Sequence, residues 1–310
     1  MTIASIDTGT NTILLLIADV NLQTGEIKVI ENLHSIPRIG KGLKEGNPMP
    51  DENIKRMFDI LTEYSESIKK HKCEKVLLTG TNALRIASNR AQLVNEIKKK
   101  YGYELDVISG EEEAKYSYLG AISGFNDNQK YLVIDIGGGS TEIIYGRGSE
   151  ILFSKSFHIG VISGTENYLV SDPPSTEQIR NFIINSQKTF SEIPKNVNDI
   201  DSAIAIAGTP TTLVCIKHKL KIYDEDIVEG STLTIEELEN FVIELSHLNS
   251  AEILNKYSQI VKGREDVLLA GTIILKEIMN KLKINEVKVS TKGIRYGAII
   301  NWLNSLKTSQ

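Results

Sequence analysis

Two short segments of the chain each place an aspartate at the end of an apolar run and follow it with small residues. Residues 6–12 carry Asp7 in this pattern, and residues 134–140 repeat it with Asp135. Small residues let the backbone approach a ligand and point amide groups toward it, which suits phosphate. An ordinary hairpin uses the same residues, so one copy alone favours a simple turn. Two copies instead favour a phosphate chain gripped from both sides, with Asp7 and Asp135 holding Mg²⁺ or Mn²⁺ between them.

A third candidate loop, residues 207–212, follows an apolar strand pattern and precedes an apolar helix. Amide groups at that helix start, around Gly208 and Thr209, are placed to bind an anion. Threonine-rich helix capping explains the same residues without a ligand. The loop alone is therefore weak evidence for a phosphate site.

Three consecutive acids, Glu111, Glu112 and Glu113, open a predicted helix behind Ser109. Ser109 and Glu112 have the spacing of a capping box, which gives Glu112 a structural role. The helix dipole favours all three acids at this helix end. Glu113 is the one that the cap leaves unexplained, and its carboxylate is a candidate to take the proton of an attacking water.

Arginines near these loops are candidate phosphate ligands. Arg85 comes shortly after a strand end, where its guanidinium can make two hydrogen bonds to phosphate oxygens. Arg264 and Arg295 follow glycines in residues 262–266 and 292–297. Exposure to solvent for Arg85, and pairing with nearby acids for the other two, are the simpler interpretations.

The residue spacings that are typical of two other catalytic mechanisms are absent from the sequence. The five histidines are scattered, with no pair spaced to bind zinc. No serine lies in a Gly-x-Ser-x-Gly motif, and Ser140 lies between two strand patterns and not between a strand and a helix. The sequence therefore disfavours a zinc site and a serine nucleophile.

The elements that must position these residues alternate between strands and helices, which predicts α/β layers. The repeat of residues 6–12 in residues 134–140 further predicts two duplicated lobes, separated near the polar stretch 124–128. Strands are expected at residues 13–18, 28–32, 75–78, 104–108, 131–136, 142–145, 151–156, 203–207 and 287–290, and helices at 54–68, 89–101, 111–123, 176–190, 235–248 and 266–282.

Length and composition limit the alternatives. The 310 residues suit two lobes, because single cores stop growing near roughly 250–300 residues. A net charge of -5 argues against a general nucleic-acid or membrane surface. We see neither a signal peptide nor an apolar segment long enough for a bilayer. Cys73 and Cys215 lie in apolar segments and are expected to be buried thiols, which suits a reducing compartment and makes the cytoplasm the default location.

With these motifs in order, the chain resembles the exopolyphosphatase / guanosine pentaphosphate phosphohydrolase family over nearly all its length. Residues 135–142, an Asp-Ile-Gly-Gly-Gly-Ser-Thr-Glu run, are the most specific match. The resemblance implies an actin-like ATPase fold, in which two ribonuclease-H-like lobes flank a central cleft. It implies a first lobe of residues 1–124 plus 294–310 and a second of residues 125–293. The other resembling segments are residues 6–12, 81–85, 109–114, 159–160, 172–174, 208–212, 263–266 and 293–297.

The resemblance also implies roles for individual residues. Glu113 resembles the family's catalytic base, and Asp135 and Glu142 resemble its acidic metal and water partners. The arginine that many relatives carry shortly after the first loop is missing here, which bears on substrate preference more than on fold. Metal binding is expected at Asp7 and Asp135, and the expected phosphate-binding residues are Asp7, Gly9, Thr10, Asn11, Thr12, Arg85, Gly137, Gly138, Gly139, Ser140, Gly208, Thr209 and Arg264.

The function expected from these residues is hydrolysis of the terminal phosphoanhydride bond of inorganic polyphosphate by metal-assisted attack of water. Hydrolysis of guanosine pentaphosphate (pppGpp) by the same residues is the first alternative. A kinase or ATPase that uses ATP and a nucleotide-binding protein without turnover, both of this fold, are the others. No nucleic-acid polymer or membrane is expected as a partner, and the oligomeric state stays open, a homodimer being one option.

Overall fold

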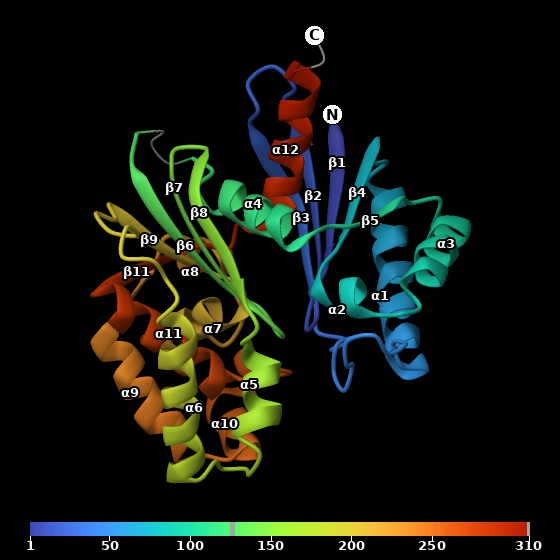
Figure 1. Cartoon of the computed structure of the whole chain (residues 1–310). Coiled ribbons are helices and arrows are strands. Elements are labelled where there is room, and N and C mark those ends of the chain that lie inside the picture. The colour runs from blue at the N-terminus through green and yellow to red at the C-terminus, as the bar shows by residue number, and fades with distance from the viewer. Residues whose placement is uncertain (125–127, 309–310) are drawn as a thin grey trace. The chain divides into compact units, whose positions relative to one another are not determined.

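The computed structural model describes residues 1–124 and 128–308. The chain divides into two compact units, the first formed by Met1–Ser123 with Lys292–Gln310 and the second by Gly124–Thr291 (Figure 1). The boundary predicted after residue 124 adjoins residues 125–127, which lie outside the described part of the chain. No helix in that described part combines the length and apolarity needed to cross a bilayer.

The first unit is built on a five-stranded sheet with the strand order β3-β2-β1-β4-β5. Strand β1 runs antiparallel to β2 and parallel to β4, so the loop after β1 and the turn after β4 leave the same edge of the sheet. The strands are β1 (Thr2–Thr8), β2 (Ile13–Val20), β3 (Ile27–Ser35), β4 (Lys75–Gly80) and β5 (Leu105–Val107).

Helices cover both faces of this sheet because its strands are apolar on both faces. Ile13, Leu15 and Ile17 share a core with α1 (Asp51–Lys70) and α3 (Arg90–Tyr101). The alternate residues Leu16, Ala18 and Val20 share another with α12 (Ile294–Thr308), as the period of two along a strand requires. Helix α4 (Gly110–Ala121) packs against α12, and the short α2 (Asn82–Ile86) follows β4 (Figure 1).

The second unit has a six-stranded sheet with the order β10-β11-β9-β6-β7-β8. Its central helix α11 is buried over most of its length, among α5, α6 and α9 (Figure 1). The strands are β6 (Lys130–Ile136), β7 (Thr141–Arg147), β8 (Glu150–Phe157), β9 (Ser202–Ile206), β10 (Thr232–Thr234) and β11 (Glu286–Val289). The helices are α5 (Val161–Tyr168), α6 (Thr176–Phe190), α7 (Gly208–Lys217), α8 (Glu225–Val228), α9 (Ile235–Ser246), α10 (Ser250–Tyr257), the 3₁₀ helix Ser258–Val261 and α11 (Leu268–Leu282).

The two sheets repeat one topology, which confirms the predicted duplication. The order β3-β2-β1-β4-β5 of the first unit recurs as β8-β7-β6-β9-β11 in the second, with three antiparallel strands continuing into parallel ones. The turns of the two repeated motifs are closed by the same backbone bond. Gly9 N donates to Thr12 O at 2.9 Å, and Gly137 N donates to Ser140 O at 2.9 Å.

Candidate active site

The first loop lies between β1 and β2, where Asp7 is 9% exposed near the strand end. Thr8 Oγ1 and Asn11 Oδ1 are buried in this region, and the described residues offer neither atom a hydrogen-bond partner. Leaving a buried polar atom unsatisfied costs about 1–3 kcal/mol. These two atoms therefore suit a loop that a bound ligand completes.

The second loop joins β6 to β7 and brings two buried carboxylates together. Asp135 on β6 lies directly opposite Glu142 on β7, and the two side chains are 8% and 1% exposed. Opposed residues of antiparallel strands have Cβ atoms about 4.5–5.5 Å apart, where like charges repel each other. Ser156 Oγ on β8 donates to Glu142 Oε1 at 2.6 Å. The pair thus favours a cation beside it.

These oxygen donors fit the metal that the sequence predicts. Carboxylates are the ligands that Mg²⁺ and Mn²⁺ prefer. Residues 1–124 and 128–308 contain no group of three or more His, Cys, Asp or Glu side chains arranged around one metal position. Mg²⁺ is usually bound by only one or two carboxylates together with substrate phosphates and water, so the carboxylate that each loop carries suits such a mode.

The third loop is held by Arg264. Arg264 Nη1 donates to Gly208 O and to Thr212 Oγ1, both at 2.9 Å. Ala207, just before α7, has φ 75° and ψ −166°, a backbone region that is almost restricted to glycine and costs roughly 1–3 kcal/mol. Burial lowers the pKa of the Arg264 guanidinium, which still stays charged. Arg264 therefore supports the strained loop that carries Thr209.

Glu113 lies in the first turn of α4 and is 7% exposed. The predicted capping box is confirmed, because Ser109 Oγ accepts from Glu112 N at 3.2 Å and Glu112 Oε2 accepts from Ser109 N at 2.9 Å. Glu112 thus caps the N-terminus of the helix. The Glu113 side chain takes no part in this capping box, as its sequence position suggested, and is available for another role.

Arg85 of α2 contacts Glu113. Its Nη1 donates to Glu113 Oε2 and to Ile108 O, both at 2.9 Å, and its side chain is 25% exposed. The described residues supply no acceptor for Arg85 Nε or Nη2. Arg85 is therefore not a freely solvated arginine, but the described residues do not satisfy all of its hydrogen-bond donors. One edge of its guanidinium remains available to a ligand.

Arg295 has a structural role. It is 3% exposed and donates from α12 to Leu15 O, at 3.2 Å, and to Asn32 Oδ1. It therefore joins α12 to β2 and β3. Cys215 is buried as expected, but the expectation for Cys73 was wrong, because its side chain packs against the core of the first unit and stays only half-buried.

Each unit brings part of the predicted site together. In the first unit Arg85 meets Glu113, while Asp7 lies near the end of β1, and Gly9, Thr10, Asn11 and Thr12 form the loop after it. In the second unit Gly137, Gly138, Gly139 and Ser140 form the turn between Asp135 and Glu142, and Gly208 meets Arg264. The sequence did not single out Thr8 or Ser156 as site residues. Thr8 carries only the ordinary signal of a strand residue, and the contact of Ser156 follows from strand register.

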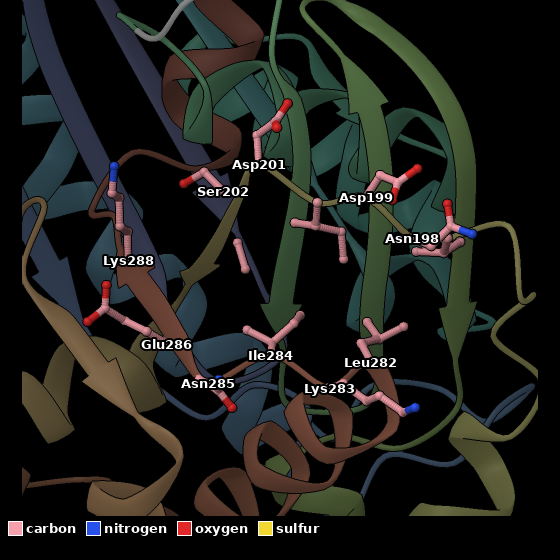
Figure 2. Close-up of a pocket in the computed structure, with 13 residues that line it drawn as sticks. Asn198, Asp199, Asp201, Ser202, Leu282, Lys283, Ile284, Asn285, Glu286 and Lys288 are labelled. Atoms are coloured by element: carbon pink, nitrogen blue, oxygen red, sulfur yellow. The ribbon is translucent and has the colours of Figure 1, made fainter.

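A cavity of about 470 Å³ in the second unit lies away from these loops (Figure 2). It is lined by residues that precede or begin β9, including Asp199 and Asp201, and by the segment from Leu282 to Lys288. These residues are at the start of the parallel strands, whereas the loops with Gly137 and Gly208 follow the strand ends. The cavity contains none of the predicted site residues.

Comparisons with known proteins identify the family of this chain. The model of the Ppx/GppA phosphatase family matches residues 16–306. Exopolyphosphatase 2 of Mycobacterium tuberculosis is 30% identical over 96% of this chain and 98% of its own length. The guanosine-5'-triphosphate,3'-diphosphate pyrophosphatase of Aliivibrio fischeri is 25% identical over 98% of this chain and 60% of its own length. The bifunctional 3-dehydroquinate synthase/phosphatase of Fusobacterium nucleatum is 30% identical over 96% of this chain, which spans only 46% of that relative.

A solved structure gives the same result. The Ppx/GppA family member of Aquifex aeolicus superposes with a TM-score of 0.85 and 28% identity, covering 100% of this chain and 99% of that one. The α/β fold with two sheets matches the two-lobed actin-like structures of this family, which confirms the predicted fold class. On both grounds, family model and structure, the chain belongs to the Ppx/GppA phosphatase family.

Proposed function

We propose that this protein hydrolyses the terminal phosphoanhydride bond of inorganic polyphosphate and releases orthophosphate. The observation that carries the proposal is the Arg85–Glu113 pair, a buried carboxylate held at 2.9 Å by an arginine with a free guanidinium edge. Support also comes from the relative named exopolyphosphatase 2, whose full length this chain covers almost completely.

In this proposal Glu113 takes the proton of a water molecule as that water attacks the terminal phosphorus. Arg85 fixes the orientation of Glu113 through Nη1 and binds phosphate oxygens through Nε and Nη2. The amide groups of the Gly9–Thr12, Gly137–Ser140 and Gly208–Thr209 segments bind the remaining phosphate oxygens. Phosphoryl transfer depends mainly on such positioning and charge stabilisation, so no covalent nucleophile is required.

Asp7 and Asp135 would hold a divalent cation, Mg²⁺ or Mn²⁺, with Glu142 beside Asp135. When bound, the cation supplies positive charge to the phosphate oxygens. Support comes from the burial of these carboxylates and from the mutual repulsion of Asp135 and Glu142, which a cation relieves. We also propose a cytoplasmic location, which the free thiols of Cys73 and Cys215 support.

Hydrolysis of pppGpp is the second candidate, supported by the relative named guanosine-5'-triphosphate,3'-diphosphate pyrophosphatase. The same residues would act on its terminal phosphate. A kinase of this fold would pass the phosphoryl group to an acceptor other than water and would not need Glu113 as a base for water, whereas an ATPase of this fold would. The contact between Glu113 and Arg85 therefore favours a hydrolase.

Phosphate release from polyphosphate, pppGpp and ATP, measured side by side with Mg²⁺, tests the proposal. We expect release from polyphosphate, and we expect Glu113→Gln to lower turnover about 10²–10⁴-fold, the usual contribution of a general base. Glu113→Gln should still bind tripolyphosphate, because a base acts on the barrier more than on ground-state affinity. Near-normal turnover by this variant, or release from ATP alone, would contradict the proposal.

A further inference from the structure

The segment that follows β8 packs against the loop between β6 and β7 and binds its carbonyl groups. At the start of α5, Val161 N donates to Gly137 O at 2.9 Å. Ile162 N and Ser163 N both donate to Gly138 O, at 2.8 Å and 3.2 Å. The first amide groups of a helix have no acceptor within the helix itself. In α5 the loop carbonyls supply those acceptors, so these amides bind the loop and are not available to an anion.

Gly160, the residue before α5, lies too close to the same loop for any side chain. A Cβ atom at this position would lie 2.6 Å from Gly137 O and 2.6 Å from both the carbonyl carbon and the oxygen of Gly138. Non-bonded atoms attract each other at roughly 3.5–4.0 Å, so these distances would be repulsive. The neighbours are backbone atoms, which cannot rotate away as a side chain can. A larger residue at position 160 would therefore displace the loop.

The first unit binds its own loop in the same way, through the irregular chain after β3. Gly40 N donates to Thr10 O at 2.8 Å, and Arg38 N donates to Asn11 O at 3.0 Å. A Cβ atom at Gly40 would meet Thr10 Cγ2 at 2.1 Å and Thr10 O at 3.2 Å. Arg38 has φ 52°, a left-handed conformation that residues other than glycine adopt uncommonly. The backbone is thus strained at the residue whose amide reaches Asn11.

The two segments correspond in position as well as in contacts. Each follows the third strand of its unit, β3 in the first and β8 in the second. Each contains an isoleucine-glycine pair, Ile39-Gly40 or Ile159-Gly160, whose isoleucine belongs to the core of its unit. In each pair the glycine packs on the second residue of the loop, Thr10 or Gly138. The duplication therefore includes the segment that supports each loop.

A loop that binds phosphate has to direct its amide groups toward the ligand and its carbonyl groups away from it. We propose that Gly40 and Gly160 are positioning residues for phosphate binding, because the segments that contain them bind the loop carbonyls and so fix the loop amides toward the phosphate chain. The inference rests on the proposed function, since it takes both loops as phosphate sites. Small shifts should matter here, because a misplacement of about 1 Å can cost about 10²-fold in rate.

Gly160→Ala and Gly164→Ala test this role within one helix. An added methyl group at Gly160 meets the loop carbonyls, whereas one at Gly164 meets the Phe182 ring, at 2.6 Å, in the core of the second unit. Both variants should be less stable in urea unfolding. Only Gly160→Ala should also raise the Kd for tripolyphosphate and the KM for polyphosphate, each about 10- to 100-fold, as expected for loss of one hydrogen bond to a charged group.

Ser163 allows a milder change that adds no atom near the loop. Its Oγ accepts from Gly160 N at 2.9 Å. Ser163→Ala removes that acceptor and should raise the Kd for tripolyphosphate about 2- to 10-fold, as expected for loss of one neutral hydrogen bond. Ser163→Thr keeps the hydroxyl and should bind like the unaltered protein. This pair of variants decides the question for the second unit even if Gly160→Ala does not fold.

The first unit allows a rescue experiment, because the nearest atom to a Cβ at Gly40 belongs to a side chain. Gly40→Ala should raise the Kd for tripolyphosphate about 10- to 100-fold, since its methyl group meets Thr10 Cγ2. Thr10→Ser removes Cγ2 and keeps the hydroxyl. The double variant should therefore bind tripolyphosphate about as tightly as Thr10→Ser alone, which a double-mutant cycle measures.

Two results would overturn the assignment while hydrolysis by the unaltered protein remained. One is an equal Kd for tripolyphosphate in folded Gly160→Ala and Gly164→Ala, or in Ser163→Ala and Ser163→Thr. The other is a double variant that binds as weakly as Gly40→Ala. Failure of the proposed function would look different, because the unaltered protein would then bind tripolyphosphate and release no phosphate from polyphosphate or pppGpp.

Discussion

One side of the Arg85 guanidinium contacts the Glu113 carboxylate, and the edge formed by Nε and Nη2 has no acceptor among the described residues. This arrangement determines how each replacement of Arg85 should behave. Arg85→Lys keeps a charge near Glu113 but loses the planar fork, so the KM for polyphosphate should rise about tenfold. Arg85→Ala should raise it further and also lower the free energy of unfolding by on the order of 2 kcal/mol. That loss is smaller than for a fully buried pair because the Arg85 side chain is 25% exposed.

The kinetics should be measured at fixed ionic strength, since screening alters every phosphate contact. Urea unfolding of the same variants measures the change in the free energy of unfolding. If both variants kept an unchanged KM, Arg85 would be a structural partner of Glu113 and not a phosphate ligand.

Tyr64 links the first loop to the pH dependence of stability. Its hydroxyl donates to Ile13 O at 2.8 Å, just after that loop, and also forms a hydrogen bond with Ser35 Oγ at 3.1 Å. Burial raises the pKa of Tyr64 to about 12, above the unfolded value of about 10. The folded phenol holds its proton more tightly, so the contribution of Tyr64 is complete below pH 10 and decreases as pH rises to 12. The loss amounts to about 3 kcal/mol at most.

Tyr64→Phe should be less stable at neutral pH, through loss of these hydrogen bonds, and should show a shallower decline between pH 10 and 12. Urea unfolding at a series of pH values checks this. Other titrating groups are common to both proteins, so the difference between the two curves isolates Tyr64. Parallel curves would show that Tyr64 ionises equally in the folded and unfolded protein.

At the scale of elements, the N-termini of helices position residues of the candidate site. Two capping boxes allow a matched comparison. Ser109 caps α4, which carries Glu113 in its first turn, and Ser175 caps α6 in the same way. Either serine replaced by alanine should cost about 1 kcal/mol of stability. Only Ser109→Ala should also lower kcat, because only α4 orients the proposed base. Equal kcat in the two variants, measured with polyphosphate, would mean that the cap does not position Glu113.

Elements with a strong local signal could be predicted from the sequence. Helix α6 begins at residue 176 and ends at residue 190 as predicted, because its capping box and one apolar face specify both. Helices α5 and α10 were missed, since eight residues are too few for a periodic pattern to stand out. Helix α11 starts at Leu268 and not at residue 266, because residues 262–267 form turns.

In the candidate site too, some features could be predicted from the local sequence and others could not. Asp7 and Asp135 could be singled out because each lies near a strand end beside small residues, a local pattern. The contact between Arg85 and Glu113 joins residues 28 positions apart, and the contact between Glu142 and Ser156 depends on how β7 pairs with β8. Such contacts are set by tertiary packing and strand register, which the local sequence does not encode.

At the scale of the molecule, an acidic protein with a net charge of -5 has to bind a polyanion. A metal cation is then needed to offset repulsion, so a chelator should abolish turnover. Asp135→Asn should raise the Mg²⁺ concentration for half-maximal activity, because an amide is a poorer ligand for a hard cation. Asp199→Asn, at a position 81% exposed, is the control and should leave it unchanged. Full activity after rigorous metal removal would contradict the role of metal.

The first unit is discontinuous in sequence, and this affects how the protein is made. The apolar residues Ile3, Leu16 and Val20 are covered by Tyr296 and Ile299 of α12. During synthesis, the second unit, Gly124–Thr291, has to be translated in between, which takes roughly 10–30 s at about 5–20 residues per second. Over that time one face of the first sheet stays uncovered and is open to chaperones or to aggregation. The second unit can meanwhile fold as its own chain emerges, so the part of the molecule that leaves the ribosome first is completed last.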